Sequence, residues 1–302
     1  MGTPDFAVPT LEAIAKSSHE VATVVTRSDA PRGRGRRLAA PEVKIAAESL
    51  GIPVLQPTKL RAPEFVESLR EVGADLFVVV AFTILPKVLL ALPRLGSINL
   101  HPSLLPKYRG AAPINWAIIN GERGTGITTF LLSGRVDAGD VLIQERVDIG
   151  DEETAGELYE RLKVQGAGTI LKTLDGLAEG RLEGKPQSDE GATPAPRLAK
   201  ETGRIDWTQS AEQIQNLVRG TNPFPGAFTM WGGQPLKIHR VSLTSGSVAP
   251  GSVSIADDRD GIVVGTGEGS VRLEELQPQG KKRMDGPSFV RGYRVDAGIT
   301  FG

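Results

Sequence analysis

Residues 97–113 of the chain read SINLHPSLLPKYRGAAP. The pattern predicts a short buried strand from Ser97 to His101, then a loop with Pro and Gly at its turns, and a helix from near Pro113. Asn99 and His101 are two residues apart on this strand, so we expect both side chains on one face where the sheet ends. Loops that follow buried strands commonly bind ligands, so this stretch is the first candidate site.

The segments around this stretch alternate between helical and strand patterns. Strands are predicted at 20–26, 54–55, 75–82, 125–132 and 141–149, and helices at 6–18, 41–50, 63–72, 85–92, 114–120 and 154–177. The last helix has Thr154 as its expected N-cap, with Glu157 completing a capping box. This alternation predicts an α/β fold with a doubly wound, mostly parallel sheet of the Rossmann type.

The composition changes between residues 180 and 200, where Gly, Pro, Ala and charged residues predominate. We therefore predict a catalytic domain at 1–179, a linker at 180–200 and a second domain at 201–302. The second domain has one helical pattern at 210–219, and its short strand patterns alternate with Gly and Pro turns at 227–230, 236–243, 261–264 and 270–276. This spacing predicts a small OB-like β-barrel, with a hairpin turn at 265–269.

The overall composition excludes several classes of protein. A chain of 302 residues with ordinary hydrophobic and charged fractions fits a two-domain globular protein. No stretch approaches the roughly 20 apolar residues of a membrane span, and no signal peptide is visible, so we expect a cytoplasmic protein without a membrane partner. The absence of Cys and the wide spacing of the three His give no metal motif.

A carboxylate completes the candidate site. Asp137 lies on a Gly-rich turn after another predicted strand, where it could orient His101 and support its charged form. Asn, His and Asp together suit acyl transfer to an external nucleophile, because an amide and an imidazolium can stabilise an oxyanion. Taken singly, a buried His is more often a packing residue, and an Asp beside Gly is more often a turn former.

A second candidate is the arginine-rich segment at 32–37, which carries Arg32, Arg34, Arg36 and Arg37. This density without helical periodicity fits phosphate contacts or insertion into a nucleic-acid groove, and a solvated loop is the alternative. The segment matches a dinucleotide fingerprint poorly, because bulky Arg side chains stand where a pyrophosphate would approach the backbone.

The motif at 99–110, together with Asp137-Ala138-Gly139-Asp140, resembles the folate-dependent formyltransferase family. In that family the catalytic Asn, His and Asp correspond to Asn99, His101 and Asp137. Within the family, residues 2–7, the arginine segment followed by 41–44, and 204–207 resemble the tRNA-acting branch, the methionyl-tRNA formyltransferases. The resemblance covers nearly the whole chain.

The resemblance implies a reaction and its partners. A formyl group would move from 10-formyltetrahydrofolate to the α-amine of methionine on initiator methionyl-tRNA, for translation initiation. Asn99 and His101 would stabilise the oxyanion, while Asp137 would hold His101 and assist proton removal. The folate would lie along Phe82, Ile84, Leu85, Ser103, Leu104, Leu105 and Pro106, and the tRNA acceptor stem would meet Arg32, Arg34, Arg36 and Arg37. The C-terminal barrel would follow the tRNA, and no metal or obligate protein partner is implied.

The sequence departs from the family pattern in two places. The apolar strand that normally precedes the Gly-Thr-Pro turn is missing, and we expect its loss to leave unpaired backbone groups and an uncovered core. One hypothesis is that the natural protein starts upstream of Met1. The segment Ala81–Pro86 is one residue short and lacks the usual Gly, so we expect an altered wall of the folate pocket.

Two alternatives remain open from the sequence. A formyltransferase acting on an amino-sugar nucleotide would share the catalytic motif, but we would not expect the arginine segment in it. An inactive tRNA-binding protein would retain that segment and lose catalysis, which the missing strand makes conceivable.

Overall fold

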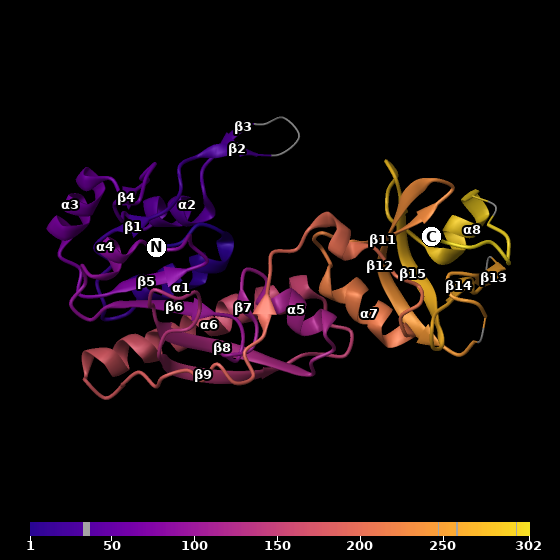
Figure 1. The fold of residues 1–302 in the computed structure, drawn as a ribbon. Coiled ribbons are helices and arrows are strands. Elements are labelled where there is room, and N and C mark those ends of the chain that lie inside the picture. The colour runs from indigo at the N-terminus through magenta and orange to yellow at the C-terminus, as the bar shows by residue number, and fades with distance from the viewer. Residues whose placement is uncertain (33–36, 247, 258, 294) are drawn as a thin grey trace. The chain divides into compact units, whose positions relative to one another are not determined.

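The computed structural model describes residues 1–302 except 33–36, 247, 258 and 294 (Figure 1). Backbone contacts divide the chain into two compact units, which we describe separately. The first unit comprises Met1–Ala111, Thr125–Asp148 and Tyr159–Ala195, and the second comprises Ala112–Gly124, Ile149–Leu158 and Pro196–Gly302. None of the helices in the described part of the chain combines the length and hydropathy needed to cross a membrane.

The main sheet of the first unit has the order β5-β6-β8-β9 (Figure 1). Its strands are β5 (Phe77–Val80), β6 (Ser97–His101), β8 (Gly124–Leu131) and β9 (Val141–Asp148). β5 and β6 pair in parallel, whereas β6 and β8 pair antiparallel. The predicted α/β fold is therefore confirmed, with an antiparallel portion that the sequence patterns did not reveal.

Helices and short elements surround this sheet. They are η1 (Asp5–Ala7), α1 (Val8–Ala15), α2 (Glu42–Ser49), α3 (Pro63–Val72), α4 (Lys87–Leu90) and α6 (Ala155–Ala178). α3 buries Phe65 and Leu69 in a core with Phe77 of β5, as its amphipathic pattern predicts. On α6, a Cβ at Gly166 would lie 2.7 Å from Leu100, so glycine permits close packing against β6.

A gap separates β5 from β1 (Val24–Val25), which pairs in parallel with β4 (Val54–Leu55). Among the described residues, Met1 and Gly2 make the backbone hydrogen bonds that connect the two edges. The Gly2 N–H donates to Val25 O (3.1 Å), the Met1 amino group donates to Val78 O (2.7 Å), and Met1 O accepts from the Val80 N–H (2.9 Å).

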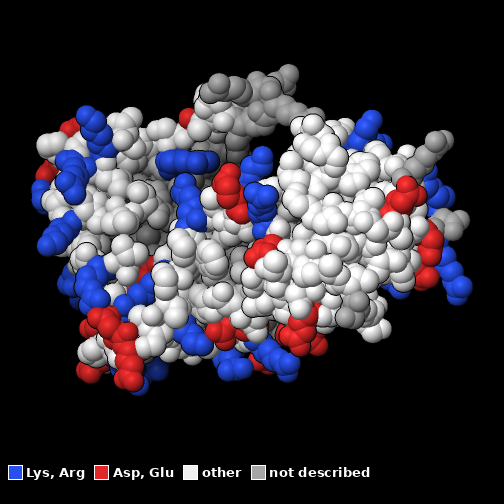
Figure 2. Space-filling view, turned by 45° about the vertical axis from the view of Figure 1, so that its right-hand side comes forward, with Lys and Arg blue, Asp and Glu red and all other residues white. Residues whose placement is uncertain are grey.

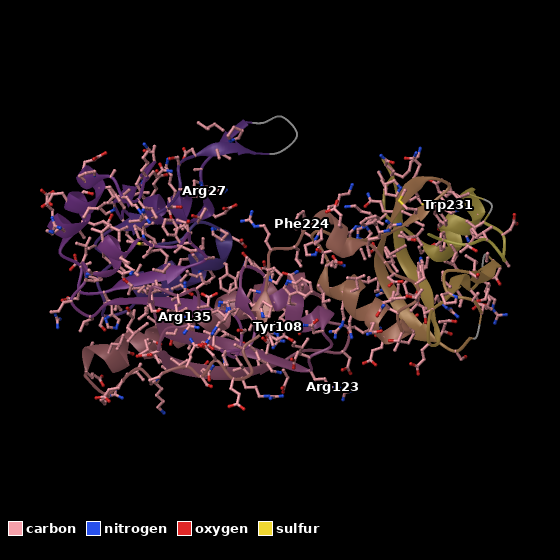
Figure 3. All side chains as sticks on the ribbon, in the orientation of Figure 1. Arg27, Tyr108, Arg123, Arg135, Phe224 and Trp231 are labelled. Carbon is pink, nitrogen blue, oxygen red and sulfur yellow. The ribbon has the colours of Figure 1, made fainter. Side chains whose placement is uncertain are left out.

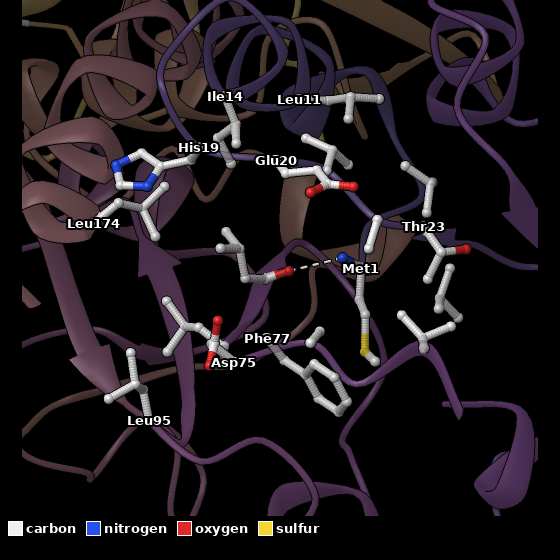
Figure 4. Close-up of a pocket in the computed structure, with 18 of the residues that line it drawn as sticks. Met1, Leu11, Ile14, His19, Glu20, Thr23, Asp75, Phe77, Leu95 and Leu174 are labelled. Atoms are coloured by element: carbon white, nitrogen blue, oxygen red, sulfur yellow. Dashed lines mark hydrogen bonds between the residues drawn. The ribbon is translucent and has the colours of Figure 1, made fainter. Parts of the chain in front are cut away.

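Beyond these two residues the gap continues as a cavity of about 780 Å³, which we call the N-terminal slot (Figure 4). Its lining combines apolar residues such as Leu11, Ile14 and Phe77 with polar ones such as His19 and Glu20. The slot agrees with the gap in the sheet that the sequence predicts. It also explains why β1 is only two residues long although residues 20–26 have strand character.

The arginine segment was predicted as a loop, but in the structure its two ends belong to a pair of antiparallel strands. β2 (Ala30–Arg32) and β3 (Arg37–Ala39) pair antiparallel, with Pro31 opposite Leu38. The sequence prediction was wrong for these ends because Pro31 and the dense Arg residues obscure the strand pattern. Arg34 and Arg36 lie outside the described residues.

Part of the segment 180–200 is also a strand. β10 (Pro194–Ala195) pairs in parallel with β7 (Arg109–Gly110), directly after the candidate catalytic loop. Gly110 has φ 130°, and a Cβ there would lie 2.6 Å from Ala195 O. This close approach of two backbones requires glycine.

The second unit contains a six-stranded antiparallel sheet of order β11-β12-β15-β14-β13, with β16 paired to β15. The strands are β11 (Ala227–Trp231), β12 (Gln234–Thr244), β13 (Val253–Asp257), β14 (Gly261–Gly265), β15 (Ser270–Pro278) and β16 (Met284–Asp285). The remaining elements are α5 (Pro113–Ile119), η2 (Lys200–Gly203), α7 (Ala211–Gly220) and α8 (Gly286–Tyr293).

This sheet packs with α7 and α8 around a core that includes Trp207, Ile214, Leu236 and Phe289. The predicted turn at 265–269 is confirmed, since Gly265 pairs with Ser270 across the hairpin. The patterns missed β13, β16 and α8 because these elements of two to eight residues are too short to show a sustained hydrophobic period. The capping box at the start of α6 is present, with reciprocal bonds between Thr154 and Glu157.

Candidate active site

β6 delivers two of the candidate catalytic side chains. Ile98 and Leu100 are buried, which fixes the strand against the core and leaves Asn99 and His101 on its other face. Asn99 is half-buried, and His101 is only 4% exposed. The His101 Nε2 lies 2.8 Å from Tyr108 O, and because a carbonyl only accepts, Nε2 carries the proton.

The turn between β8 and β9 brings Asp137 to His101. The Asp137 Oδ2 lies 3.8 Å from His101 Nδ1 and accepts a hydrogen bond from the Gly110 N–H at 2.8 Å. The structure therefore brings Asp137 and His101 together, with Asn99 beside His101 on the strand. Sequence separation between Asp137 and His101 is large, so only the fold could establish this proximity.

Burial lowers the pKa of His101 below its ordinary value, while the Asp137 charge and the Tyr108 carbonyl act in the opposite direction. Neutral His101 carries its proton on Nε2, so the Nδ1 lone pair lies on the side of Asp137. A proton taken up at Nδ1 would be stabilised by the neighbouring carboxylate. The pair can thus hold and release one proton inside a buried site.

Three non-glycine residues among those described have positive φ, and all lie on loops that leave the main sheet. They are Ala81 (47°), Tyr108 (62°) and Asp137 (48°). Such conformations cost about 1–2 kcal/mol each for residues with a Cβ, so the surrounding contacts must maintain them. Tyr108, which is labelled with Arg135 in Figure 3, positions the carbonyl that binds His101.

The loop after β6 is internally bonded. The Ser103 hydroxyl is buried and donates to Lys107 O (2.7 Å), and Ser103 O accepts from the Thr128 hydroxyl (2.6 Å). Leu105 is buried and its carbonyl accepts from the Gln144 amide (2.7 Å). Leu104 and Pro106 are half-buried, so in this predicted folate-binding loop they have the more accessible side chains.

The segment after β5 also mixes exposed and buried side chains. Ile84 is 76% exposed, Phe82 is half-buried against the core, and Leu85 is buried. A cavity of about 390 Å³ lies here, lined by Lys59, Leu60, Arg61, Ile84, Leu85 and Pro86. The sequence reasoning missed Lys59 and Arg61 because they form no motif and precede the segment by 20 residues or more.

A strip of the chain between residues 187 and 195, which we call the belt, binds the catalytic loops. The Arg109 guanidinium donates to Asp189 (2.8 Å), and Arg135 binds both oxygens of the same carboxylate. Thr193 accepts from the N–H groups of Tyr108 and Arg109. The belt was missed because its Gly- and Pro-rich composition is typical of a linker.

The base of the arginine hairpin is held by charged and amide groups. Lys44 binds both oxygens of Asp29 at 3.0 Å, and Gln56 donates to Asp29 and to Arg27 O, each at 2.8 Å. The Gln56 and Lys44 bonds lower the pKa of Asp29. These bonds fix the point at which the arginine segment is attached to the first unit.

Charges of both signs occur over the face in Figure 2, where Lys and Arg side chains lie among Asp and Glu. This mixture agrees with the formal net charge of −1. Within the described parts of the chain, no group of three or more His, Asp or Glu is arranged to hold a metal ion.

Two family descriptions together match most of the chain. Residues 1–174 match the family described as Formyl transferase, and residues 197–294 match Formyl transferase, C-terminal domain. The methionyl-tRNA formyltransferase of Geobacter metallireducens is 51% identical over all of this chain and 97% of its own length. The methionyl-tRNA formyltransferase of Acetivibrio thermocellus is 45% identical over all of this chain and 98% of its own length.

Solved structures share the fold at lower identity. The sugar 3N-formyl transferase WlaRD superposes with a TM-score of 0.69 at 18% identity, over 93% of this chain and 97% of that one. An N-formyltransferase from Helicobacter canadensis gives 0.68 at 19% identity, over 92% and 97%. These sugar enzymes therefore share only the fold with this chain. The relatives that are 45–51% identical over the full length are methionyl-tRNA formyltransferases. This chain belongs to the methionyl-tRNA formyltransferase family.

Proposed function

We propose that the chain transfers the formyl group of 10-formyltetrahydrofolate to the α-amine of methionine on initiator methionyl-tRNA, with Asn99, His101 and Asp137 as its catalytic residues. The observation that carries this proposal is the contact between buried His101 and half-buried Asp137 at the end of β6, with half-buried Asn99 beside it on the strand. This arrangement supplies charge stabilisation and proton transfer without a nucleophilic side chain.

The reaction exchanges one C–N bond for another. The methionine amine attacks the formyl carbon, the bond from that carbon to the folate nitrogen breaks, and the proton lost by the amine is returned to that nitrogen. Asn99 donates a hydrogen bond to the oxyanion. Asp137 accepts the amine proton through water and shares it with His101, and the resulting imidazolium adds positive charge beside the oxyanion until the proton passes to the folate nitrogen.

The folate is proposed to lie against both loops that follow β5 and β6. Phe82, Ile84, Leu104 and Pro106 would supply side-chain contacts, because each is at least partly exposed. Leu85, Ser103 and Leu105 are packed within the chain, so they would shape the loops that contact the folate. Lys59 and Arg61 would offset the negative charge of the glutamate carboxylates of folate.

The tRNA is proposed to meet Arg32, Arg34, Arg36 and Arg37 at the top of its acceptor stem, and the domain at 201–302 farther along. Next to strands β2 and β3, which flank the arginine segment, Asp29 accepts hydrogen bonds from Lys44 and Gln56. Guanidinium groups suit phosphate and groove contacts, and such contacts weaken with added salt.

A formyltransferase for an amino-sugar nucleotide is the second candidate, and an inactive tRNA-binding protein is the third. The sugar enzymes share the fold at 18–19% identity, which carries no inference about the acceptor. The direct test incubates the protein with 10-formyltetrahydrofolate and charged initiator tRNA and measures formylmethionine.

Substitution separates these candidates. Replacing both Arg34 and Arg36 with Ala should weaken use of the tRNA steeply in a tRNA enzyme, whereas a sugar enzyme would be indifferent. His101→Ala should abolish transfer, and transfer that survives it would refute the catalytic assignment. Binding of tRNA by the intact chain without any transfer would favour the inactive binder.

A further inference from the structure

Gln187, on the belt, connects the two loops that meet at His101. Its Nε2 donates to the main-chain carbonyls of Asp137 (3.1 Å) and Gly139 (2.6 Å), and its Oε1 accepts from Arg109 Nη2 (2.9 Å). We propose that Gln187 is a positioning residue of the active site, which holds the Asp137 turn so that the carboxylate faces His101. This inference rests on the proposed function of the site.

The Asp137 turn needs such support. Asp137 has φ 48°, a left-handed conformation that is unfavourable for a residue with a Cβ. Gly139 is packed so closely that a Cβ would lie 1.7 Å from Leu131 O. The Gln187 amide binds the carbonyls of Asp137 and Gly139 in this closely packed turn. These two bonds fix the direction in which the Asp137 side chain leaves the turn.

The other end of the Gln187 side chain is fixed as well. Arg109, its partner, also binds Asp189, and the main-chain N–H of Arg109 donates to Thr193 O (2.9 Å). Arg109 directly precedes Gly110, whose N–H binds the Asp137 carboxylate. Gln187 therefore links the two backbone segments that hold Asp137. It binds the carbonyls of the Asp137 turn directly, and through Arg109 it contacts the segment whose Gly110 N–H binds the Asp137 carboxylate.

Only an amide can make all of these contacts at this position. It offers two N–H donors and one acceptor on a single planar group. Glutamate would match the size and keep the acceptor for Arg109, but it would place a second oxygen against two carbonyls. Leucine would match the bulk and make none of the bonds, leaving two partly buried carbonyls without this donor.

The experiment compares Gln187→Leu, Gln187→Glu and the matched control Gln165→Leu. Gln165 is an exposed residue of α6 in the same unit and has no role in the site. Steady-state formylation should show kcat reduced roughly 10- to 100-fold in both Gln187 variants, because small displacements of catalytic groups have effects of this size. KM for the folate and for the tRNA should change by less than about twofold, since Gln187 acts through Asp137. The control should resemble the wild type.

A second readout follows His101 directly by NMR titration of its imidazole in the Gln187→Leu protein. Movement of the carboxylate away from Nδ1 should lower the pKa of His101, because Asp137 raises it in the intact site. Wild-type kcat in either Gln187 variant, or an unchanged His101 pKa in the Leu variant, would overturn the proposal. If one variant does not fold, the other still tests it through kcat. Absence of transfer by the wild type would instead reject the proposed function, while the titration would still test the positioning.

Discussion

The two edges of strand β5 differ in how their polar groups are partnered. Toward β6, residues Phe77–Val80 pair in register with Ser97–Leu100, and the loops beyond β6 are tied down by side chains of the belt. Toward β1, the backbone bonds in the part of the chain that the structure describes come from Met1 and Gly2, and the N-terminal slot remains beyond them. The catalytic side chains and the N-terminal slot therefore lie on opposite sides of one strand, and mutations should affect them separately.

The largest expected effect is on the catalytic side. Asp137→Asn keeps the shape of the side chain but removes its charge, so His101 loses the group that stabilises its imidazolium. We expect kcat to fall by about 10²- to 10⁴-fold, as for loss of a general base. The pKa of His101 should fall too, because the Asp137 charge raises it. Formylation rates and NMR titration check the two effects.

If the two edges of β5 are independent, Asp137→Asn should not alter packing at the N-terminal slot. The melting temperature of this variant should stay within a few degrees of the wild type. A large loss of stability would show that the catalytic loops and the N-terminal slot form one cooperative structure, contrary to the separation inferred from their contacts.

The slot can be tested by filling it. A strand of about five apolar, β-branched residues added ahead of Met1 would extend the bonds that Met1 and Gly2 begin. Each buried side chain contributes about 1.5–3 kcal/mol, offset by about 1–2 kcal/mol per ordered residue, so we expect a net gain of a few kcal/mol. Thermal unfolding should show a melting temperature higher by roughly 5–10 °C.

The control for this extension has the same length but carries Pro and Asp in place of the central apolar residues, because these break a strand ladder and resist burial. It should leave the melting temperature near that of the chain as given. Equal melting temperatures and equal activity for the chain and its apolar extension would contradict the view that the slot accepts a strand.

A smaller effect in the same region is a dependence of stability on pH. Burial lowers the pKa of the Met1 amino group from 8.0 to about 5. Between these values the unfolded chain binds more protons than the folded one, so this group makes stability rise with pH from about 5 to 8, and its effect is constant below that window. The contribution is on the order of 1.4 kcal/mol per pH unit within the window.

Denaturant unfolding at several pH values measures this slope. The apolar extension removes the amino group from its position beside Val78, so the slope should be shallower in the extended protein. Other titrating groups contribute equally to both proteins, which makes the difference specific to Met1. Parallel curves for the two proteins would show that the amino group is hydrated in the folded state.

The contrast between the two edges also explains what the sequence could predict. β6 and its Asn-x-His spacing were visible because apolar and polar residues alternate along a short run that ends in a Pro- and Gly-containing loop. The gap in the sheet was predictable because a turn follows Met1 at once. The role of Gln187 was not predictable, because it lies in a Gly- and Pro-rich segment without periodicity. Its partners Arg109 and Asp137 are 78 and 50 residues away in the sequence. Only folding reveals such long-range polar contacts.

The smallest expected effect concerns the cavity beside Ile84, on the loop after β5. Lys59→Ala combined with Arg61→Ala removes two exposed cations from its lining. Exposed charge contacts contribute about 0.2–1 kcal/mol each, so KM for the folate should rise about two- to tenfold while kcat and the melting temperature hardly change. Raising the salt concentration should reduce the difference from the wild type, since screening weakens the same attraction. An unchanged KM at low salt would exclude this cavity as the place where the folate carboxylates bind, leaving β5 with a functional role only through its pairing with β6.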